Sequence, residues 1–338
     1  MTLKVARLDV LTCLGIESTA DNLGIGIASS DGRILANEIT THVPEEGGIH
    51  PREAARHHAE VVGDTITRAL STAGITSRDL DFIAFAQGPG LGPCLRTGAT
   101  AARALSSYLK LPLVGVNHCV AHIEIGRLTE GADDPLTLYV SGGNTMVTGY
   151  EEGRYRVFGE TLDIALGNCL DVFARAADLP YPGGPAVEEL ALKGETLIPL
   201  PYVVKGMDLS YSGLMTAATQ ELAAGRHSLE DICFSLQEVA YGMLGEVTER
   251  ALAHTGKGEL LLTGGVGANK RLRSMVGLIA EEHGAEANFV PIRYATDNGA
   301  MIAWTGVIAY MHGVRTPIAE SFIDSKWRVD QVEVPWRG

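Results

Sequence analysis

The chain contains two histidines, His118 and His122, whose type and spacing suit metal chemistry. If the segment 117–122 is helical, side chains four residues apart leave the same face of the helix, one turn apart. Asp297 lies about half the chain away, in the segment 295–299. Its carboxylate would complete a facial site of two histidines and one carboxylate, a ligand set that leaves positions open for water or substrate. These residues therefore predict a candidate metal site.

The histidine pair also has other interpretations. Two histidines at this spacing occur as ordinary surface or core residues of a helix, and no third ligand lies nearby in the sequence. A zinc protease would need a glutamate directly after the first histidine as its general base, and Cys119 occupies that position. The sequence thus argues against a metallopeptidase, and a metal site requires a ligand from a distant part of the chain.

The composition is that of a folded, acidic protein. At 338 residues the chain is long for one domain and suggests two, and 46% hydrophobic residues can form a sizeable core. The 27 Lys and Arg against 41 Asp and Glu give a net charge of −14. Such a chain does not attract nucleic acid by its overall field, so an RNA substrate would require a local basic patch or basic partner subunits.

The cysteines and the hydropathy pattern indicate a cytoplasmic protein. The five cysteines are scattered and form no CxxC pair, which is typical of a reducing compartment and not of a disulfide framework. Residues 1–11 lack the long apolar core of a secretory signal, and no apolar run reaches membrane-spanning length. We therefore expect a cytoplasmic location and no membrane partner.

A pattern of strand, polar turn, strand, turn and strand occurs twice. The first copy covers 13–38 with its polar turn at 18–22, and the second covers 138–158 with its polar turn at 141–145. The repetition predicts a duplicated α/β architecture. In a doubled fold of this kind the two polar turns can face each other across a cleft, where their backbone N–H groups would bind phosphate.

The duplication also predicts how the chain divides. We expect an N-terminal subdomain over 1–134, which carries the histidine pair, and a C-terminal subdomain over 135–338. The Asp-Asp-Pro turn at 133–135 is the best boundary between them. The last helix of the second subdomain can pack back on the first.

Several predicted elements position the candidate metal ligands. A helix over 48–74 and a strand over 81–86 precede an alanine-rich helix over 97–109. A buried strand over 113–116 then delivers His118 at its C-terminal end, where ligand sites in α/β folds usually lie. Asp297 directly precedes the final helix, expected over 298–312.

Other loops of the second half suit a nucleotide. A strand over 259–262 runs into the glycine-rich loop 263–269, which opens a helix and so places backbone N–H groups and the helix dipole near an anion. A helix over 168–178 carries Asp171, and a short helix after a Pro-Gly-Gly-Pro turn carries Glu188. One glycine-rich loop is a weak signal, but two that follow strands in a duplicated fold favour a phosphate or purine site.

Eight short strings, in order along most of the chain, resemble the TsaD/Kae family, the universal tRNA threonylcarbamoyl-transfer family. They are GGIHPRE at 47–53, GPGL at 88–91, VNHCVAHIE at 116–124, YVSGGNT at 139–145, YPGGP at 181–185, LSYSGL at 209–214, GGVGAN at 264–269 and TDNG at 296–299. The HCVAH form and the tyrosine before SGGN are similar to the archaeal and eukaryotic branch, which works within the KEOPS complex.

The resemblance implies an actin-like, Hsp70-like and sugar-kinase-like ATPase fold, with two duplicated subdomains around a nucleotide cleft. In the family, the positions of His118, His122 and Asp297 bind one divalent metal per subunit, iron or zinc, and Tyr139 can approach it. Another site holds the nucleotide part of threonylcarbamoyl-adenylate, and ATP or ADP can also occupy it. That site is formed at the positions of Tyr139, Val140, Ser141, Gly142, Gly143, Asp171, Gly184, Glu188 and Asn269.

The implied activity is acyl transfer to tRNA. The threonylcarbamoyl group would pass from its adenylate to N6 of the adenosine 3′ of the anticodon, in tRNAs that read codons beginning with A, to form N6-threonylcarbamoyladenosine. A metal would act as a Lewis acid on the mixed anhydride. Asp171 and Glu188 suit ribose hydroxyls, and the glycine-rich turns suit phosphate. No residue is assigned as catalytic, because the group that accepts the proton of the adenosine amine is not evident from the sequence.

The resemblance also implies partners. Besides tRNA these are a Bud-type small kinase/ATPase, a Pcc-type dimerising subunit and a Cgi-type tRNA-binding subunit of the KEOPS complex. Their basic surfaces would compensate for the acidic charge of this chain. One departure from the family concerns the nucleotide, since Val172 follows Asp171 where members usually carry lysine.

Two alternative functions remain. An ATPase or small-molecule kinase of the same fold would need a magnesium–ATP site and an aspartate directed at a substrate hydroxyl, and it leaves the two histidines without a role. A non-catalytic scaffold would need neither ligand set. Acyl transfer accounts for the largest number of the residues named above.

Overall fold

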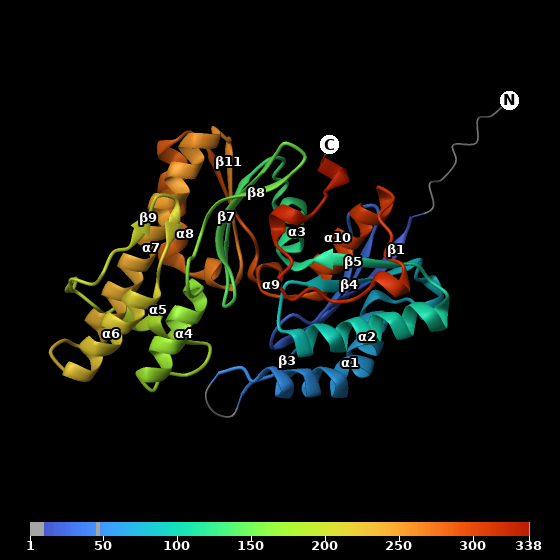
Figure 1. The fold of residues 1–338 in the computed structure, drawn as a ribbon, viewed down its shortest axis with the longest axis horizontal. Helices are drawn as coiled ribbons and strands as arrows, with labels where there is room; N and C mark the ends of the chain where they lie inside the picture. Colours follow the sequence, from blue (N-terminus) through green and yellow to red (C-terminus); the bar gives the residue numbers. More distant parts are fainter. Residues whose placement is uncertain (1–9, 45–47, 338) are drawn as a thin grey trace. The chain divides into compact units, whose positions relative to one another are not determined.

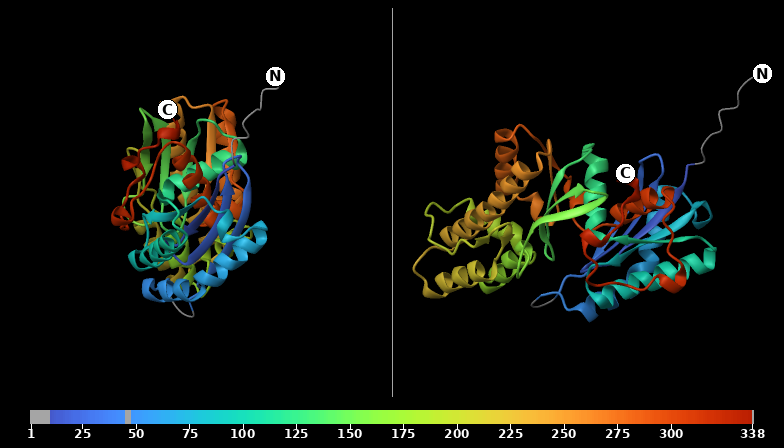
Figure 2. Two further views of the ribbon diagram at one scale, coloured as in Figure 1. Left: turned by 90° about the vertical axis from the view of Figure 1, so that its right-hand side faces the viewer. Right: turned by 45° about the horizontal axis from the view of Figure 1, so that its top comes forward.

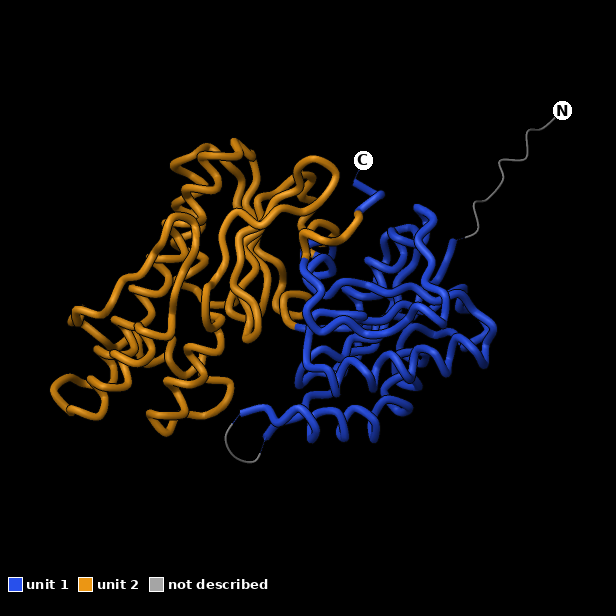
Figure 3. Tube along the Cα trace, in the orientation of Figure 1, with its two compact units in different colours: residues 1–125, 297–328, 334–338 blue, residues 126–296, 329–333 orange. Residues whose placement is uncertain are grey.

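The computed structural model describes residues 10–44 and 48–337, which form two α/β units (Figure 1). Unit 1 contains the chain up to residue 125, residues 297–328 and the chain from residue 334 (Figure 3). Unit 2 contains residues 126–296 and 329–333. Gly47, the first residue of the GGIHPRE string, lies outside the described residues, as does most of the stretch 1–11.

Unit 1 is built on a five-stranded sheet in the order β3-β2-β1-β4-β5. The first three strands form an antiparallel meander, and β1, β4 and β5 run parallel. Nearly every residue of β1, β2 and β4 is buried, as expected of strands with covered faces. The strands are β1 (Thr12–Glu17), β2 (Asn22–Ser29), β3 (Ile34–Thr41), β4 (Phe82–Gly88) and β5 (Leu113–Asn117).

Helices cover both faces of this sheet. Helices α1 (Pro51–Ala73) and α2 (Gly92–Leu109) lie side by side along one face (Figures 1 and 2). Helix α10 (Gly299–Met311) packs on β1, β2 and β4 at the opposite face. Gly26 of β2 permits this close approach, since a Cβ there would lie 2.2 Å from the backbone nitrogen of Ala300. The sheet of unit 1 therefore lies between helices from opposite ends of the chain.

Unit 2 has a second five-stranded sheet, in the order β12-β11-β6-β7-β8. Strands β6, β11 and β12 run parallel, whereas β6, β7 and β8 form an antiparallel meander. The strands are β6 (Leu136–Val140), β7 (Thr145–Glu151), β8 (Arg154–Glu160), β11 (Glu259–Thr263) and β12 (Glu286–Phe289), and a separate ribbon pairs β9 (Val204–Lys205) with β10 (Asp208–Leu209).

The long helix α7 (Leu229–Thr255) packs against several other helices of unit 2. Side chains of α7 such as Leu236 and Leu244 share one apolar core with Phe173 and Tyr211. The other helices are α4 (Leu166–Ala176), α5 (Gly183–Ala191), α6 (Ser212–Ala224), α8 (Lys270–Glu282) and the short α9 (Ile292–Ala295).

The two sheets have the same topology. Read from the outer strand of each meander, the orders β3-β2-β1-β4-β5 and β8-β7-β6-β11-β12 correspond strand by strand. Each sheet places its first strand at the centre, between an antiparallel and a parallel neighbour. The predicted duplicated α/β architecture is confirmed.

The predicted elements agree with the structure to within a few residues at most ends. The expected helix over 48–74 is α1, and the expected helix over 298–312 is α10. Helix α2 begins at Gly92 and not at 97, because Pro93 lies in its first turn, where a missing backbone N–H costs nothing. No helix of the described residues has the length and apolar character needed to span a membrane.

The chain passes between the units at different places from the single boundary expected at 133–135. The first passage lies between Ile125 and Gly126, within helix α3 (His118–Glu130). The last long helix, α10, belongs to unit 1, where its backbone packs against β1 and β2. Residues 297–328 thus return to the first unit, because the glycines of its central strands leave room for the backbone of α10.

Candidate metal centre and nucleotide loops

The two histidines are held at the C-terminal end of β5. This strand ends at Asn117, whose side-chain oxygen accepts hydrogen bonds from the backbone nitrogens of Cys119 (3.0 Å) and Val120 (3.1 Å). These bonds cap the first turn of α3, so the helix starts immediately after the strand. His118 and His122 are both buried, and their ring centroids lie 4.7 Å apart. The prediction that both leave one helix face is confirmed.

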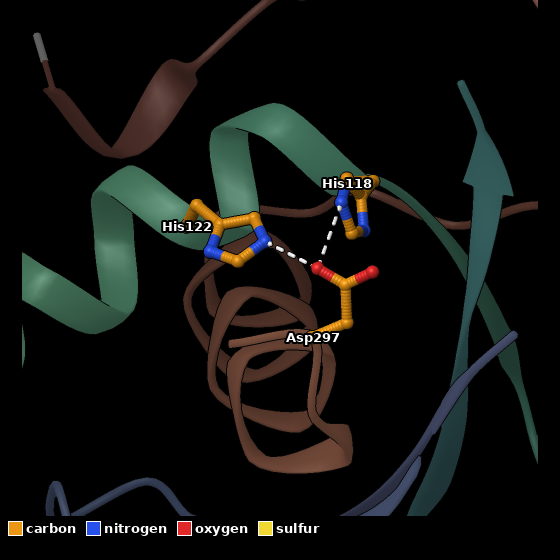
Figure 4. Close-up of side chains that lie close together, drawn as sticks. All are labelled: His118, His122 and Asp297. Atoms are coloured by element: carbon orange, nitrogen blue, oxygen red, sulfur yellow. Dashed lines mark hydrogen bonds and ion pairs between the residues drawn. The ribbon is translucent and has the colours of Figure 1, made fainter. Parts of the chain in front are cut away.

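Asp297 reaches the same place from the start of α10. Its Oδ1 lies 3.1 Å from Nε2 of His122 and 3.5 Å from Nε2 of His118 (Figure 4). The next residue, Asn298, caps α10 by accepting from the backbone nitrogen of Met301 at 3.0 Å. One candidate ligand atom from each of the three side chains lies within 4.8 Å of the others. The structure therefore brings together the three residues that the sequence analysis selected, and all three belong to unit 1.

Glu17, at the C-terminal end of β1, is a further part of this cluster that the sequence analysis missed. It is 0% exposed, and its Oε2 lies 3.0 Å from Nδ1 of His118. Its Oε1 accepts hydrogen bonds from the backbone nitrogen of Thr19 at 2.7 Å and from the Thr19 hydroxyl. The signal available in the sequence was a glutamate at the end of an apolar strand, directly before a Ser-Thr turn.

The electrostatics of the cluster favour a cation. Burial acts to lower the pKa of His118, but the carboxylates of Glu17 and Asp297 outweigh it and raise this pKa to about 9. Burial acts to raise the pKa of Asp297, but the two imidazoles outweigh it and lower this pKa to about 2. Burial lowers the pKa of His122. Two carboxylates thus stabilise a positive charge beside them, and two imidazole nitrogens with a carboxylate are a ligand set suited to iron or zinc.

Tyr139 lies on β6 of unit 2 and is buried. Its hydroxyl accepts long hydrogen bonds from the Ser141 hydroxyl (3.4 Å) and from Nδ2 of Asn144 (3.5 Å). The side chain is therefore joined to the polar turn that follows its own strand. Its predicted approach to a metal stays a prediction.

The two predicted nucleotide loops lie at one edge of the unit 2 sheet. Strands β6 and β11 are parallel neighbours, with Tyr139 paired to Thr263, so the turn 141–144 and the loop 264–269 both follow C-terminal strand ends. The loops are in close contact, since a Cβ at Gly264 would lie 2.1 Å from the carbonyl oxygen of Val140. This arrangement matches the place where open α/β sheets bind ligands.

The turn after β6 presents its backbone to solvent. The Ser141 hydroxyl accepts from the backbone nitrogens of Gly143 (3.3 Å) and Asn144 (3.1 Å), which fixes the turn. Gly142 and Gly143 are exposed, and a Cβ at either would meet open space. The carbonyl of Ser141 accepts from the nitrogen of Gly167 at 3.2 Å, so α4 begins against this turn. The absence of side chains at these two glycines leaves the backbone of the turn accessible to a ligand.

Hydrogen bonds connect the other predicted nucleotide residues to the helices that begin near this turn. Asp171 of α4 accepts from the nitrogen of Gly183 at 2.7 Å, where α5 begins, and burial raises the pKa of its carboxyl. Glu188 of α5 accepts from the nitrogen of Lys270 at 2.8 Å, where α8 begins. Asn269 caps α8 through the nitrogen of Leu272 at 3.0 Å and donates to Gln237 at 3.0 Å.

These contacts place the predicted residues in one region of unit 2. Gly184 lies in the first turn of α5, next to the residue that Asp171 holds, and the nearest atom to a Cβ there would be 3.9 Å away. Asp171, Glu188 and Asn269 each stabilise the start of a helix, which the sequence did not indicate. Their contacts with a nucleotide stay predictions.

Comparison with known proteins decides the family. The family model of TsaD, described as tRNA N6-adenosine threonylcarbamoyltransferase, matches residues 33–304. The chain belongs to the TsaD family. A protein of Thermofilum pendens named tRNA N6-adenosine threonylcarbamoyltransferase is 58% identical over 97% of this chain and 97% of its own length. A protein of the same name from Thermococcus gammatolerans is 55% identical over 96% of this chain and 100% of its own length.

Some TsaD relatives are longer than this chain. A protein of Methanocaldococcus jannaschii named probable bifunctional tRNA threonylcarbamoyladenosine biosynthesis protein is 55% identical over 96% of this chain. The match covers 60% of that protein. This TsaD chain therefore spans the part that the longer and shorter relatives share.

Solved structures show the fold. The structure of HypF from T. kodakarensis aligns with 89% of this chain and 48% of its own, with a TM-score of 0.64 and 16% identity. Component A of (R)-2-hydroxyglutaryl-CoA dehydratase from Acidaminococcus fermentans aligns with 88% of this chain and 98% of its own, with a TM-score of 0.55 and 15% identity. Both are proteins of the actin-like ATPase fold, which confirms the fold class expected for a TsaD protein.

Proposed function

We infer that this TsaD chain is the acyltransferase that forms N6-threonylcarbamoyladenosine in tRNA. The observation that carries this inference is the near full-length similarity to proteins named for that activity, at 55–58% identity. The chain also retains a His-His-Asp cluster at the place where the family resemblance predicts a metal. We propose that the donor is threonylcarbamoyl-adenylate and that the acceptor is the adenosine 3′ of the anticodon, in tRNAs that read codons beginning with A.

We propose that His118, His122 and Asp297 hold one divalent metal, iron or zinc, with Tyr139 as a further ligand. The support is the donor set: two imidazole nitrogens and a carboxylate oxygen lie within 4.8 Å of one another in a largely buried site. Asp297, with 19% of its side chain exposed, leaves this site open to solvent. When bound, the metal would supply Lewis-acid stabilisation of the charge that develops on the anhydride oxygens.

The adenylate part of the donor is assigned to unit 2. We propose that the backbone of Val140, Ser141, Gly142 and Gly143, together with Tyr139, holds its phosphate, and that Asp171, Gly184, Glu188 and Asn269 surround its nucleoside. The exposed glycine turn at a C-terminal strand edge supports the first assignment. The acceptor oxygens of Asp171 and Glu188 suit ribose hydroxyls. ATP or ADP would occupy the same residues.

Partners and location belong to the same proposal. The chain carries a net charge of −14, so tRNA binding requires basic surface from other subunits. We propose that these are the KEOPS subunits of the Bud, Pcc and Cgi types. A cytoplasmic location agrees with five scattered cysteines and with a tRNA substrate.

The test is transfer of radiolabelled threonine to tRNA in a mixture with an adenylate-forming enzyme and the partner subunits. We compare wild type with His118→Ala and Asp297→Ala, and we use His312→Ala as the matched control, because His312 is exposed at the end of α10. Wild type and His312→Ala should label tRNA, whereas the two cluster variants should fail while staying folded. If the cluster variants label tRNA like wild type, the metal proposal is wrong. If wild type itself fails with every partner present, an ATPase, kinase or scaffold function is favoured.

A further inference from the structure

Glu17 is a buried carboxylate that neither the predicted metal ligands nor the predicted nucleotide residues include. It ends β1 and is fully buried, at 0% exposure. A carboxylate in such a place is unfavourable unless hydrogen bonds satisfy its oxygens. Here both oxygens accept: Oε1 from the nitrogen and hydroxyl of Thr19, and Oε2 from Nδ1 of His118 at 3.0 Å. The orientation of the carboxylate is therefore fixed from two sides.

The contact with His118 determines which ring nitrogen carries a proton. A carboxylate oxygen accepts hydrogen bonds, so in the neutral imidazole that binds a metal the single ring proton of His118 lies on Nδ1, which donates to Glu17. The other nitrogen, Nε2, is the one that lies 3.5 Å from Oδ1 of Asp297, on the side where His122 also approaches. A histidine binds a metal through a nitrogen that carries no proton. Glu17 thus selects the tautomer and the ring orientation that leave Nε2 of His118 directed at the cluster.

We propose that Glu17 is a positioning residue for the metal centre, which orients the ring of His118 and holds its proton on Nδ1. A carboxylate bonded to the remote nitrogen of a metal-bound histidine has this effect in known metal sites. The proposal rests on the metal role of His118, His122 and Asp297 and adds a residue that does not itself touch the metal. Loss of Glu17 should weaken metal binding without removing a ligand.

The GPGL string at 88–91 contacts Thr19, the residue that donates hydrogen bonds to Glu17. A Cβ at Gly90 would lie 2.8 Å from both Cβ and the carbonyl oxygen of Thr19, so only glycine lets this turn approach so closely. The nitrogen of Leu91 donates to the same carbonyl oxygen at 2.8 Å. The turn thereby holds Thr19, Thr19 holds Glu17, and Glu17 holds His118. This gives a structural reason for a string that the proposed function left without a role.

The experiment measures zinc affinity by competition with a chelator, using the full chain. The variants are Glu17→Ala, Glu17→Gln and, as the matched control, Glu124→Gln. Glu124 is equally buried in unit 1, but its Oε1 accepts from Nε1 of Trp336 at 2.8 Å. Glu17→Ala should weaken zinc binding by about 10- to 100-fold. Glu17→Gln should weaken it less, because the amide oxygen still accepts from Nδ1 but carries no charge, and Glu124→Gln should bind like wild type.

A proton NMR spectrum of the zinc-loaded protein separates positioning from a loss of structure. The Nδ1 proton of His118, held by Glu17, should give a slowly exchanging downfield signal in wild type, which His118→Ala identifies. The signal should disappear in Glu17→Ala and persist in Glu124→Gln. If Glu17→Ala does not fold, Glu17→Gln carries both measurements.

The outcomes distinguish this proposal from the metal proposal on which it rests. If wild type binds zinc and the Glu17 variants bind it equally well, Glu17 has no positioning role, and the metal proposal survives. If wild type binds no zinc or iron in a His118-dependent manner, both proposals are wrong. A loss of affinity in the Glu17 variants, with an unchanged unfolding midpoint of the metal-free Glu17→Gln protein, supports the positioning role.

Discussion

The side chain of Asn117 joins three parts of unit 1, and its removal should destabilise that unit. Its Oδ1 caps α3 through two backbone nitrogens, and its Nδ2 donates to the carbonyl oxygen of Trp327 at 3.0 Å. Asn117→Ala loses the cap, worth about 0.5–2 kcal/mol, and leaves the carbonyl of Trp327 without this donor, at about 1–3 kcal/mol. We expect unit 1 to lose roughly 1.5–5 kcal/mol of its free energy of unfolding, the sum of the two contributions.

Tryptophan fluorescence is a selective assay for this loss. The chain has three tryptophans, at 304, 327 and 336, and all three belong to unit 1. Urea unfolding followed by fluorescence therefore reports unit 1, and the midpoint should fall while the slope stays unchanged. Ser228→Ala is the control, because Ser228 caps α7 of unit 2 through the nitrogen of Asp231 at 3.1 Å. It should leave the fluorescence midpoint where it is in wild type.

The same substitution should also weaken zinc binding, since Asn117 fixes the turn on which His118 lies. If Asn117→Ala lowers the free energy of unfolding by less than about 0.5 kcal/mol, which is the effect of an ordinary surface substitution, the assigned role of this side chain is wrong. A loss that appears equally in Ser228→Ala would show that fluorescence does not report unit 1 alone.

Three further predictions follow from the packing, the charges and the ligand set. Gly26→Ala should lower the free energy of unfolding by about 1–3 kcal/mol or more in fluorescence-detected urea unfolding, because a Cβ there would lie 2.2 Å from the backbone of α10. Gly63→Ala, at an open position in α1, should instead raise the free energy of unfolding by about 0.5–1 kcal/mol. Although burial acts to raise it, hydrogen bonds from the hydroxyls of Ser210 and Ser212 hold the pKa of Asp163 well below its usual range. The stability contributed by Asp163 is thus fully present above its unfolded pKa of about 3.9 and is lost as the pH falls through its folded pKa. The difference in urea midpoint between wild type and Asp163→Asn, followed by circular dichroism, should therefore be smaller at pH 2 than at pH 7. Removal of the metal by a chelator should abolish tRNA labelling. Zinc at about 100 times its Kd should raise the free energy of unfolding of the metal-free protein by about 2.7 kcal/mol, and Asp297→Ala should not show this increase.

The duplicated fold places each candidate site at the corresponding edge of its sheet, where the parallel strands end. In unit 1 the cluster forms at the C-terminal ends of β1 and β5, through Glu17 and His118. In unit 2 the nucleotide loops follow the C-terminal ends of β6 and β11. Parallel strands end at one edge of a sheet, so both units collect polar turns there.

The residues that depend on local periodicity could be predicted from the sequence. The spacing of His118 and His122 places them on one helix face whatever the rest of the chain does, because four residues make about one helical turn. The repeated strand and turn pattern likewise predicted two similar sheets, since alternation and turn residues are local signals. The residue types and loops suggested Asp297 and part of the nucleotide site, and the family strings added the remaining nucleotide residues by resemblance.

The tertiary structure alone decided the residues that act through long-range contacts. Glu17 lies 101 positions before His118, and no period or motif in the sequence relates them; the pairing of β1 with β4 and of β4 with β5 brings them together. The return of α10 to unit 1 likewise depends on glycines of β1 and β2 that permit contact between backbones. Sequence patterns fix the period and the exposed face of each element. Which elements become neighbours depends on complementary surfaces that are distant along the chain, and for this protein those contacts complete the candidate metal centre.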